Sequence, residues 1–561
     1  MVIKEDVLIE LDAQKIKEHI QPYPVVTFDV FDTLIKRDVK NFRDIFNILK
    51  TEYEKISGRH LPIWFFRERV HAPKKARKKY AKEEVSLYEI YDVIHCRDKE
   101  LLAKLECNIE IECATRNPVL YEVYQYCLQA GKKIYAISDM YLPTECIQRI
   151  LLKCGYHLEK VYVSQEFNAT KQNGKLFELF LSEKKYASNQ VIHIGDNIVA
   201  DVYGAKKIGI QSVHIPNQNT KLHYFPSRKF GLSTSKNILY KYINNRLDKL
   251  DGTERVGYEV LGPILYYLTT WIHDKVQKND IKKLYFLSRD GFLIMKAYEE
   301  LYSEEQVECH YLLVSSKSVR NAFKNTNCQK KLFIKYLRQN NMHGKVAIID
   351  IGWSGRLHKM LTSLANDFAE VCGFYFGTFK LFYKNISDGI SGGYLDISRW
   401  KRAQIFMNAG FIEILFSDTQ HGTTERYEQN DTEVIPVTSQ ANPNGNKLKK
   451  IQAGALRFLK DWNDSRYCDL SFSSAYLIKP MLQFSMNPKV EDLEDLMDEQ
   501  TGSGNDYKPL VGVNMDGNGM IKKLEELRQV CWKGGFISLN FPKCIHIIYK
   551  FLNPILVYFK G

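Results

Sequence analysis

Short apolar runs alternate with longer amphipathic segments in the N-terminal part of the chain. Three of these runs, at 25–28, 132–137 and 191–194, predict buried strands, and each is followed by a small or acidic residue. Apolar residues between the runs recur at helical spacing. Strands that alternate with helices in this way predict an α/β fold built on a parallel sheet.

The same alternation returns in the middle of the chain. Apolar runs at 283–287, 311–314, 346–351 and 374–376 predict strands, with helical patterns such as 260–271 nearby. A second α/β domain is therefore expected. Changes in composition indicate the boundaries between domains. The predicted parts are a first domain at 20–216, a linker or extension at 217–250, a second domain at 251–430, and a polar linker followed by a mostly helical, basic region at 431–561.

The first predicted strand is separated from the second by about a hundred residues, far more than a strand-to-helix turn requires. Apolar residues at helical spacing predict an inserted helical cap over about residues 36–125. Pro73 should start or kink a helix there. A basic cluster in the cap suits an anionic substrate or a solvated helix face, and its members are Lys74, Lys75, Arg77, Lys78, Lys79 and Lys82.

Acidic side chains directly follow two of the predicted strands. Asp29 and Asp32 come after the first strand and Asp196 after the third, with Asp201 five residues further on. Because the carboxyl ends of parallel strands meet at the edge where ligands bind, these residues should lie together. Carboxylates can attack phosphorus and form aspartyl-phosphates, so Asp29 is the predicted nucleophile.

The residues after the other strands complete a site for phosphoryl transfer. Ser138 and Lys171 would hold phosphoryl oxygens through a hydroxyl and a point charge. Magnesium prefers hard oxygen ligands, which Asp29, the Phe31 carbonyl and Asp196 would supply. Asp201 would complete this metal site by orienting it from behind those ligands. The sequence therefore predicts Mg²⁺ as cofactor.

These segments, in this order, resemble the haloacid dehalogenase (HAD) superfamily. The resemblance rests on DVFDTL at 29–34, ISDM at 137–140, Lys171, and GDNIVAD at 195–201. It implies a Rossmann-like sheet with a helical cap that closes over the active site and selects the substrate. More narrowly, FDVFDTL and SDMYL are similar to a bacterial group encoded among genes for capsule and other surface polysaccharides.

One departure from the family pattern affects the mechanism. HAD phosphatases carry a general acid and base two residues after the nucleophile, where this chain has Phe31, and the next carboxylate is Asp32. Three interpretations follow: Asp32 substitutes, the enzyme is slow, or the phosphoryl group passes to an acceptor other than water. The superfamily's dehalogenases also lack that acid, but they do not keep the Gly-Asp pair found here at 195–196, so phosphoryl chemistry is preferred.

Length, charge and cysteine content narrow the class of protein. The 561 residues exceed one core, and the formal charge of +13 suits anionic small molecules or lipid head groups. Nucleic acid is not expected, because the basic and aromatic residues at 240–249 are interrupted by Asp248 and no nucleic-acid motif appears. The 12 cysteines show no zinc spacing, and a cytoplasmic location is expected because no signal peptide is visible.

Two further segments carry open alternatives. Ser288, Arg289 and Asp290 follow a predicted strand, and the 352–355 loop offers backbone N–H groups, so these segments are either a second binding site or ordinary turns. The basic, aromatic tail at 544–559 suits either peripheral contact with an anionic membrane or a core or dimer helix. The sequence sets no oligomeric state.

The sequence leaves two possible functions. The preferred one is a Mg²⁺-dependent hydrolase or phosphotransferase acting on a phosphorylated sugar, nucleotide sugar or lipid-linked intermediate of surface-polysaccharide biosynthesis. The alternative is a weakly catalytic or non-catalytic scaffold that binds a partner from that pathway, which Phe31 favours.

Overall fold

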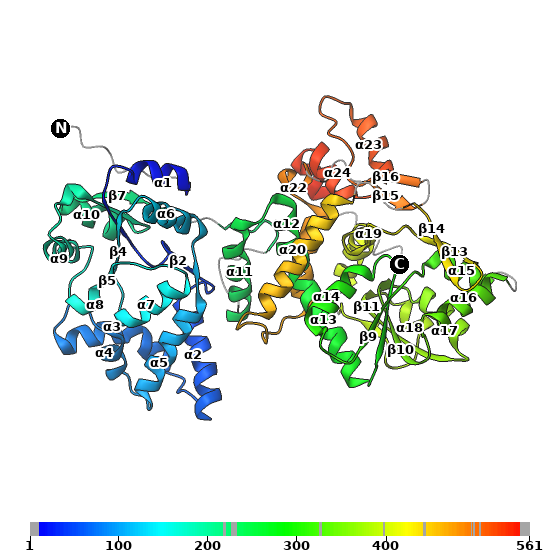
Figure 1. The fold of residues 1–561 in the computed structure, drawn as a ribbon, viewed down its shortest axis with the longest axis horizontal. Helices are drawn as coiled ribbons and strands as arrows, with labels where there is room; N and C mark the ends of the chain where they lie inside the picture. The colour runs from blue at the N-terminus through cyan, green and yellow to red at the C-terminus, as the bar shows by residue number, and fades with distance from the viewer. Residues whose placement is uncertain are drawn as a thin grey trace. The chain divides into compact units, whose positions relative to one another are not determined.

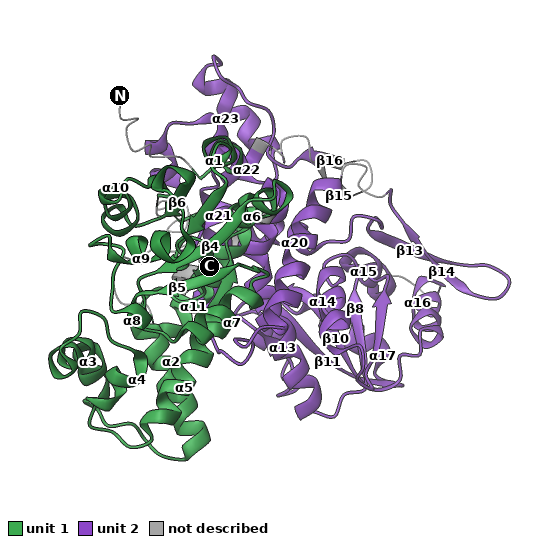
Figure 2. Cartoon of the chain, turned by 60° about the vertical axis from the view of Figure 1, so that its left-hand side comes forward, with its two compact units in different colours: residues 1–221, 228–249 green, residues 222–227, 250–561 purple. Residues whose placement is uncertain are grey.

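The fold of the chain consists of two compact units. The computed structural model describes residues 11–216, 220–225, 233–324, 328–395, 399–440, 445–494, 496, 500–503 and 506–549. Unit 1 comprises residues 1–221 and 228–249, and unit 2 comprises 222–227 and 250–561 (Figure 2). Each unit contains a five-stranded sheet in which all neighbouring strands are parallel (Figure 1). The predicted α/β class is confirmed.

The sheet of unit 1 has the order β5-β4-β1-β6-β7. Its strands are β1 (Val25–Phe28), β4 (Lys133–Ser138), β5 (Lys160–Val163), β6 (Val191–Gly195) and β7 (Gln211–His214). All four residues of β1 are buried, as expected for the central strand of a sheet covered on both faces. Its position places the residues that follow β1 between those that follow β4 and β6.

The segments before and between these strands, outside the cap, form helices. They are α1 (Ala13–Ile20), α6 (Pro118–Gln129), α7 (Thr144–Lys153), α8 (Ser164–Phe167), α9 (Lys175–Lys184), η1 (Ser188–Gln190), η2 (Ile198–Tyr203) and α10 (Gly204–Lys207). Leu176, Phe177 and Phe180 of α9 pack with Tyr135 and Tyr162 of the sheet in one buried cluster. Helix α6 begins with Pro118, whose fixed φ and missing N–H suit the first helical turn.

The expected helical cap is present between β1 and β4. It consists of α2 (Phe42–Ser57), α3 (Phe65–Tyr80), α4 (Leu87–Asp92) and α5 (Lys99–Cys113), joined to the sheet by the antiparallel pair β2 (Ile35–Arg37) and β3 (Ala114–Arg116). Capping boxes start α2 and α4, and Gly58 ends α2 in the left-handed conformation. The cap ends before residue 125, since α6 contacts β4.

A buried ion pair fixes the interior of the cap. Arg69 of α3 donates to Glu106 of α5 from Nε at 3.0 Å and from Nη2 at 2.5 Å, and Tyr91 donates to the same carboxylate at 2.7 Å. Pro73 does not start a helix: contrary to expectation, it lies inside α3. Ala72 and Ala76 of the same helix are buried, and a proline at this position removes one helical hydrogen bond.

The segment predicted as a linker or extension returns to unit 1. Helix α11 (Thr234–Arg246) and the short η3 (Leu247–Lys249) lie against α2 and β2. Asn237 donates to Asp44 at 3.1 Å, and Arg246 donates to both Asp38 oxygens at 3.0 and 3.1 Å. Because these polar groups are largely buried, α11 extends the first unit.

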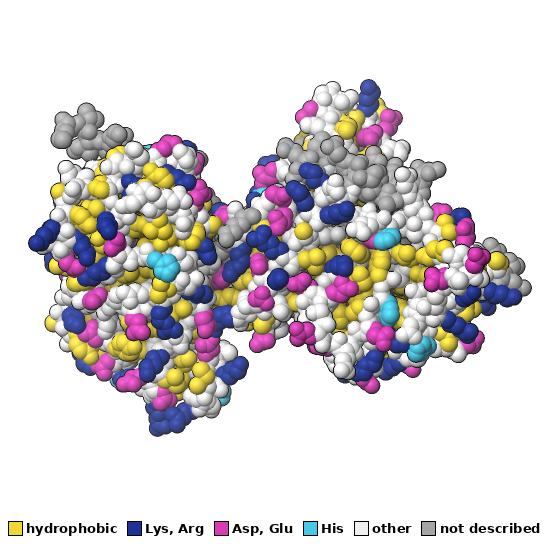
Figure 3. Space-filling view, viewed as in Figure 1, with side chains coloured by type: hydrophobic (Ala, Val, Ile, Leu, Met, Phe, Trp, Pro, Cys, Tyr) yellow, Lys and Arg dark blue, Asp and Glu magenta, His cyan; other side chains and the backbone are white. Residues whose placement is uncertain are grey.

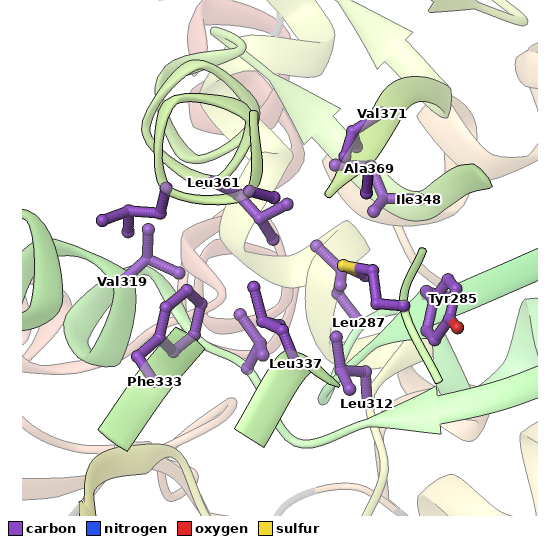
Figure 4. Close-up of a cluster of buried hydrophobic side chains, with 14 of the residues drawn as sticks. Tyr285, Leu287, Leu312, Val319, Phe333, Leu337, Ile348, Leu361, Ala369 and Val371 are labelled. Atoms are coloured by element: carbon purple, nitrogen blue, oxygen red, sulfur yellow. The ribbon is translucent and has the colours of Figure 1, made fainter. Parts of the chain in front are cut away.

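The sheet of unit 2 has the order β12-β11-β10-β8-β9. Its strands are β8 (Lys283–Leu287), β9 (Glu308–Leu312), β10 (Gly344–Trp353), β11 (Ala369–Thr378) and β12 (Gly392–Gly393). A buried cluster that includes Leu287, Ile348, Leu361 and Phe333 joins one face of this sheet to its helices (Figure 4). Apolar strands with helices between them therefore fold as the sequence predicts.

The remaining elements of unit 2 are α12 (Gly252–Val256), η4 (Gly257–Leu261), α13 (Gly262–Lys278), α14 (Phe292–Tyr302), α15 (Ser316–Lys324), α16 (Cys328–Gln339), α17 (Arg356–Ala365), α18 (Phe382–Asn385), α19 (Arg399–Phe416), β13 (Thr424–Gln429), β14 (Val434–Thr438), α20 (Asn446–Asn463), α21 (Ser474–Met486), α22 (Val490–Glu494), β15 (Gln500–Ser503), β16 (Asp506–Pro509), α23 (Met520–Gln529) and α24 (Lys533–Asn540). The polar stretch 431–447 is not a simple linker as predicted. It contains β14, whose Val434 is buried in the core of unit 2.

Two predictions concerned charge and membranes. On the face in Figure 3, Lys and Arg side chains are interspersed with Asp and Glu, so the positive excess forms no single patch there. Within the described residues, no helix is long and apolar enough to cross a membrane. The predicted basic tail is helical at 543–549, and its remainder lies outside the described residues.

Candidate active site

The carboxyl edge of the unit 1 sheet carries three of the predicted site residues. Phe28, the last residue of β1, pairs with Ala136 of β4 and Ile194 of β6. Asp29 follows and donates its backbone N–H to the Ile194 carbonyl at 2.8 Å. Ser138, which is buried, ends β4, and Asp196 follows β6. The parallel register thus brings these residues to one edge, as predicted.

Three carboxylates and one ammonium group form the centre of the site. Asp29, Asp196 and Asp201 each place an oxygen within 4.8 Å of the others. The Lys171 Nζ lies 2.5 Å from both Asp29 Oδ1 and Asp201 Oδ1. When all three carboxylates are ionised, one lysine offsets only one of their negative charges, and the group carries an excess of two.

Neighbouring side chains hold the central group in place. Asp139 accepts the Lys171 backbone N–H at 2.8 Å, and Asp201 accepts the Asn197 backbone N–H at 2.9 Å. His193 Nε2 lies 3.2 Å from Asp201, and its Nδ1 lies 2.8 Å from the Thr27 hydroxyl. Sequence reasoning gave Asp139, Asn197 and His193 no role, although a histidine inside the apolar β6 run was a signal for a buried polar contact.

Burial without enough positive charge shifts the acidities of these groups. Burial raises the pKa of Asp29 to about 8, and the Lys171 ammonium only partly opposes this. Burial, with repulsion from Asp32 and Asp201, raises the pKa of Asp196 to about 6. In contrast, Lys171 and His193 hold the pKa of Asp201 below its usual range despite its burial. The ionised trio needs further positive charge.

A divalent magnesium ion fits this donor set. Oxygen ligands around Mg²⁺ lie about 2 Å from the ion and hence about 3 to 4 Å from one another. The three carboxylate oxygens already lie within 4.8 Å of one another, and the ion would cancel the excess of two charges. Asp29, Asp196 and Asp201 would therefore hold it, with the Phe31 carbonyl as the further ligand predicted on the same loop.

Asp32 and Phe31 have different surroundings from the carboxylate trio. Asp32 has a φ of 58°, in the left-handed region that aspartate tolerates better than most residues. Its side chain is half exposed, and its Oδ2 lies 3.5 Å from Arg37 Nη2. The Arg37 guanidinium also lies 5.2 Å from the centre of the Phe31 ring. Phe31 and Asp32 thus both lie beside Arg37.

Glu110 of the cap, which lies near Arg37, is expected to make the stability of the folded protein depend on pH. Its carboxylate is 2% exposed, lies 3.8 Å from Arg37 Nη1 and leaves Oε2 without a hydrogen bond in the described structure. Burial raises the pKa of Glu110 from 4.5 to about 7, against the attraction of Arg37. The folded protein therefore binds this proton more tightly than the unfolded chain, which favours folding most below pH 4.5.

The Glu110→Gln variant is expected to become more stable than wild type as the pH rises from 5 to 8. The contribution of the Glu110 proton disappears over that interval, at roughly 1.4 kcal/mol for each pKa unit, or about 3 kcal/mol in total. Urea unfolding of both proteins across this pH range measures the difference, in which other titrating groups cancel. Glu100→Gln, on the exposed face of α5, is the control. A difference that does not change with pH would contradict the assignment.

A second polar group lies at the carboxyl edge of the unit 2 sheet. Asp290, after β8, accepts a hydrogen bond from the Ser417 hydroxyl at 2.6 Å, and Trp353 of β10 donates to Glu413 at 2.9 Å. Burial raises the pKa of Asp290, of Asp350 and of Glu413, the last to about 7. A binding role for 288–290 and 352–355 stays a prediction.

Comparisons with known proteins agree with the geometry of unit 1. A model described as haloacid dehalogenase-like hydrolase matches residues 144–215, which include Lys171, Asp196 and Asp201. This segment of unit 1 is therefore similar to HAD-like hydrolases. No match was found among curated proteins.

Solved structures of HAD enzymes are similar to about a third of the chain. One is a dehalogenase with an intermediate complex, 15% identical, with a TM-score of 0.26, covering 36% of this chain and 88% of its own. The putative HAD-hydrolase YfnB from Bacillus subtilis, bound to magnesium, has 15% identity, a TM-score of 0.26, and coverages of 34% and 87%. A predicted phosphoglycolate phosphatase from Haemophilus somnus is 15% identical, with a TM-score of 0.25, and the match covers 34% of this chain and 85% of that protein.

Proposed function

We propose that this protein is a Mg²⁺-dependent hydrolase or phosphotransferase that acts through an aspartyl-phosphate on Asp29. Its substrate class is a phosphorylated sugar, nucleotide sugar or lipid-linked intermediate of surface-polysaccharide biosynthesis. The chemistry is supported above all by the three carboxylates within 4.8 Å of one another and the single lysine between them. The setting is supported by the motif resemblance at 28–34 and 138–142.

In this proposal each residue has one task. Asp29 attacks phosphorus as a carboxylate, and its backbone hydrogen bond to Ile194 fixes the start of the loop. Lys171 neutralises charge beside the nucleophile, and the Ser138 hydroxyl donates to a phosphoryl oxygen. A bound magnesium ion would supply charge neutralisation and orientation of the phosphoryl group. Asp201 keeps Lys171 in position through their ion pair.

Asp32 does not serve as general acid in this proposal. Its carboxylate contacts Arg37 and is half exposed, whereas the reacting groups are buried. Asp32→Asn is accordingly expected to change kcat by less than about fivefold, because a lost general acid costs about 10² to 10⁴. The pH dependence of kcat for both proteins checks this. A hundredfold loss, with one limb of the pH profile removed, would instead identify Asp32 as the acid.

The function is tested by a phosphatase screen of the full chain. Sugar phosphates, nucleotide sugars and p-nitrophenyl phosphate are assayed with magnesium and again with EDTA, with Asp29→Asn as the background control. Phosphate release that requires both magnesium and Asp29 is the expected result. Absence of turnover over the whole panel, or activity that survives EDTA, would count against it and favour the scaffold alternative.

A further inference from the structure

A small basic pocket lies beside the catalytic loop in unit 1. Its volume is about 100 Å³, and it is lined by Asp32, Lys36, Arg37, Val39, Lys40, Asn41, Lys241, Asn244 and Asn245. Only Val39 among these residues is apolar. Asp32, on the loop that follows Asp29, lines the pocket, and Lys241, Asn244 and Asn245 of helix α11 line it as well.

The cations of this basic pocket exceed its anions. Four lining residues are positively charged and one, Asp32, is negative. Lys36 donates to Asp248 at 2.9 Å, and Lys221 binds the other oxygen of the same carboxylate. Asp248 is thus already shared between two lysines, and Arg37 divides its contacts between Asp32 and Glu110.

Lys241 and Lys40 are the cations that the protein itself leaves unmatched. Across the part of the chain that the structure describes, neither ammonium group has a hydrogen bond or an ion pair. Lys241 is nevertheless partly buried, and although Asp32 attracts its charge, Lys36, Arg37 and Lys40 all repel it. Burial together with this repulsion lowers the pKa of Lys241. An anion in the pocket would relieve the repulsion and bind several cations at once.

We propose that the basic pocket binds a second anionic group, a phosphate or carboxylate, of the same substrate whose phosphoryl group reaches Asp29. This inference rests on the proposed function and narrows it to substrates with two separated anionic groups. The volume accommodates one oxyanion. Asp32 lines the pocket and follows Asp29 by three residues, so the pocket borders the loop that carries the proposed nucleophile.

The basic cluster of the cap is a weaker candidate for this task. Four of its members contact carboxylates of the cap itself: Lys75 with Glu68, Arg77 with Glu84, Lys79 with Asp92 and Lys82 with Glu89. These pairs match the solvated-face alternative for helix α3. Lys74, an exposed member of the cluster, therefore offers a control that removes one positive charge without touching the pocket.

The kinetic test compares substrates with one and two anionic groups in the magnesium-loaded full chain. Lys241→Met, a neutral side chain of similar length, is expected to raise KM for fructose 1,6-bisphosphate or 2-phosphoglycolate by about tenfold or more. KM for p-nitrophenyl phosphate should stay within about twofold, and Lys241→Arg should restore the loss. Lys74→Gln should change neither. An equal effect of Lys241→Met on both kinds of substrate would overturn the proposal.

A binding test separates the pocket from the proposed chemistry. Sulfate, without magnesium, is expected to raise the Tm of wild type, Lys241→Arg and Lys74→Gln, and to raise that of Lys241→Met much less. If no substrate is turned over, this result still decides whether the pocket holds an anion. Equal stabilisation of all four proteins would overturn the pocket. Binding of sulfate without preference for doubly anionic substrates would overturn the substrate assignment and indicate a free regulatory anion.

Discussion

Replacement of Asp29 by asparagine is expected to lower kcat by about 10⁴-fold or more while the protein stays folded. The amide cannot form the aspartyl-phosphate, and no other carboxylate follows β1 at the same position. The change is also isosteric, so Lys171 keeps its ion pair with Asp201. Phosphate release and transfer of label from a phosphorylated substrate to the protein measure the two consequences.

Stability measurements show whether the loss of activity in Asp29→Asn comes from the missing nucleophile or from unfolding. Asp29 is buried beside two other carboxylates, and its pKa is raised to about 8, so the neutral amide relieves repulsion. The Tm of Asp29→Asn should therefore equal or exceed that of wild type at neutral pH. Glu178→Gln, on the exposed face of α9, controls for a general charge effect. Retained phosphorylation of the protein in the asparagine variant would exclude Asp29 as the nucleophile.

The central residues of the site could be predicted from the sequence because a short local pattern marks where a strand ends. An apolar run followed by an acidic residue marks the carboxyl edge of a parallel strand, and β1 and β6 then bring Asp29 and Asp196 together. The alternation of runs also predicted both sheets. Lys171 was found through its turn before an amphipathic helix, since that turn lies at the same edge.

Contacts between distant segments could not be predicted in the same way. The Asp139 carboxylate reaches the Lys171 backbone, and His193 reaches Asp201, only because packing sets the loop positions. The basic pocket includes Lys241 of α11, which lies near β2 although it follows that strand by more than two hundred residues in the chain. β14 was missed because residues 431–447 are polar overall, although Val434 is buried. Local composition does not reveal such partners.

Substitution of Phe31 by aspartate is the complementary experiment, since it is expected to increase hydrolysis. Phe31 occupies the position at which HAD phosphatases, which the motif at 29–34 resembles, carry their general acid, and Asp32 lies beside Arg37. A carboxyl group two residues after Asp29 would protonate the leaving group and activate water, which is worth about 10² to 10⁴ in rate. The Phe31 carbonyl, which is the predicted metal ligand, is unchanged by the substitution.

The surroundings of Phe31 bear on the size of this gain. Its ring is partly buried and lies 5.2 Å from the Arg37 guanidinium, so a new carboxylate would also approach that cation. Because Arg37 already contacts Asp32 and Glu110, its pull on a third carboxylate is divided, and a gain of about 10² is expected. Phe31→Asn is the matched control, because asparagine has the size of aspartate but no acidic proton.

The pH profile distinguishes general acid catalysis from a change in shape. With Phe31→Asp, kcat for p-nitrophenyl phosphate and for an alkyl phosphate should gain a limb that falls as the new acid loses its proton. The gain should be larger for the alkyl phosphate, because its poorer leaving group needs the proton more. Equal rates in the aspartate and asparagine variants would contradict this prediction, because leaving-group protonation would then not limit the reaction.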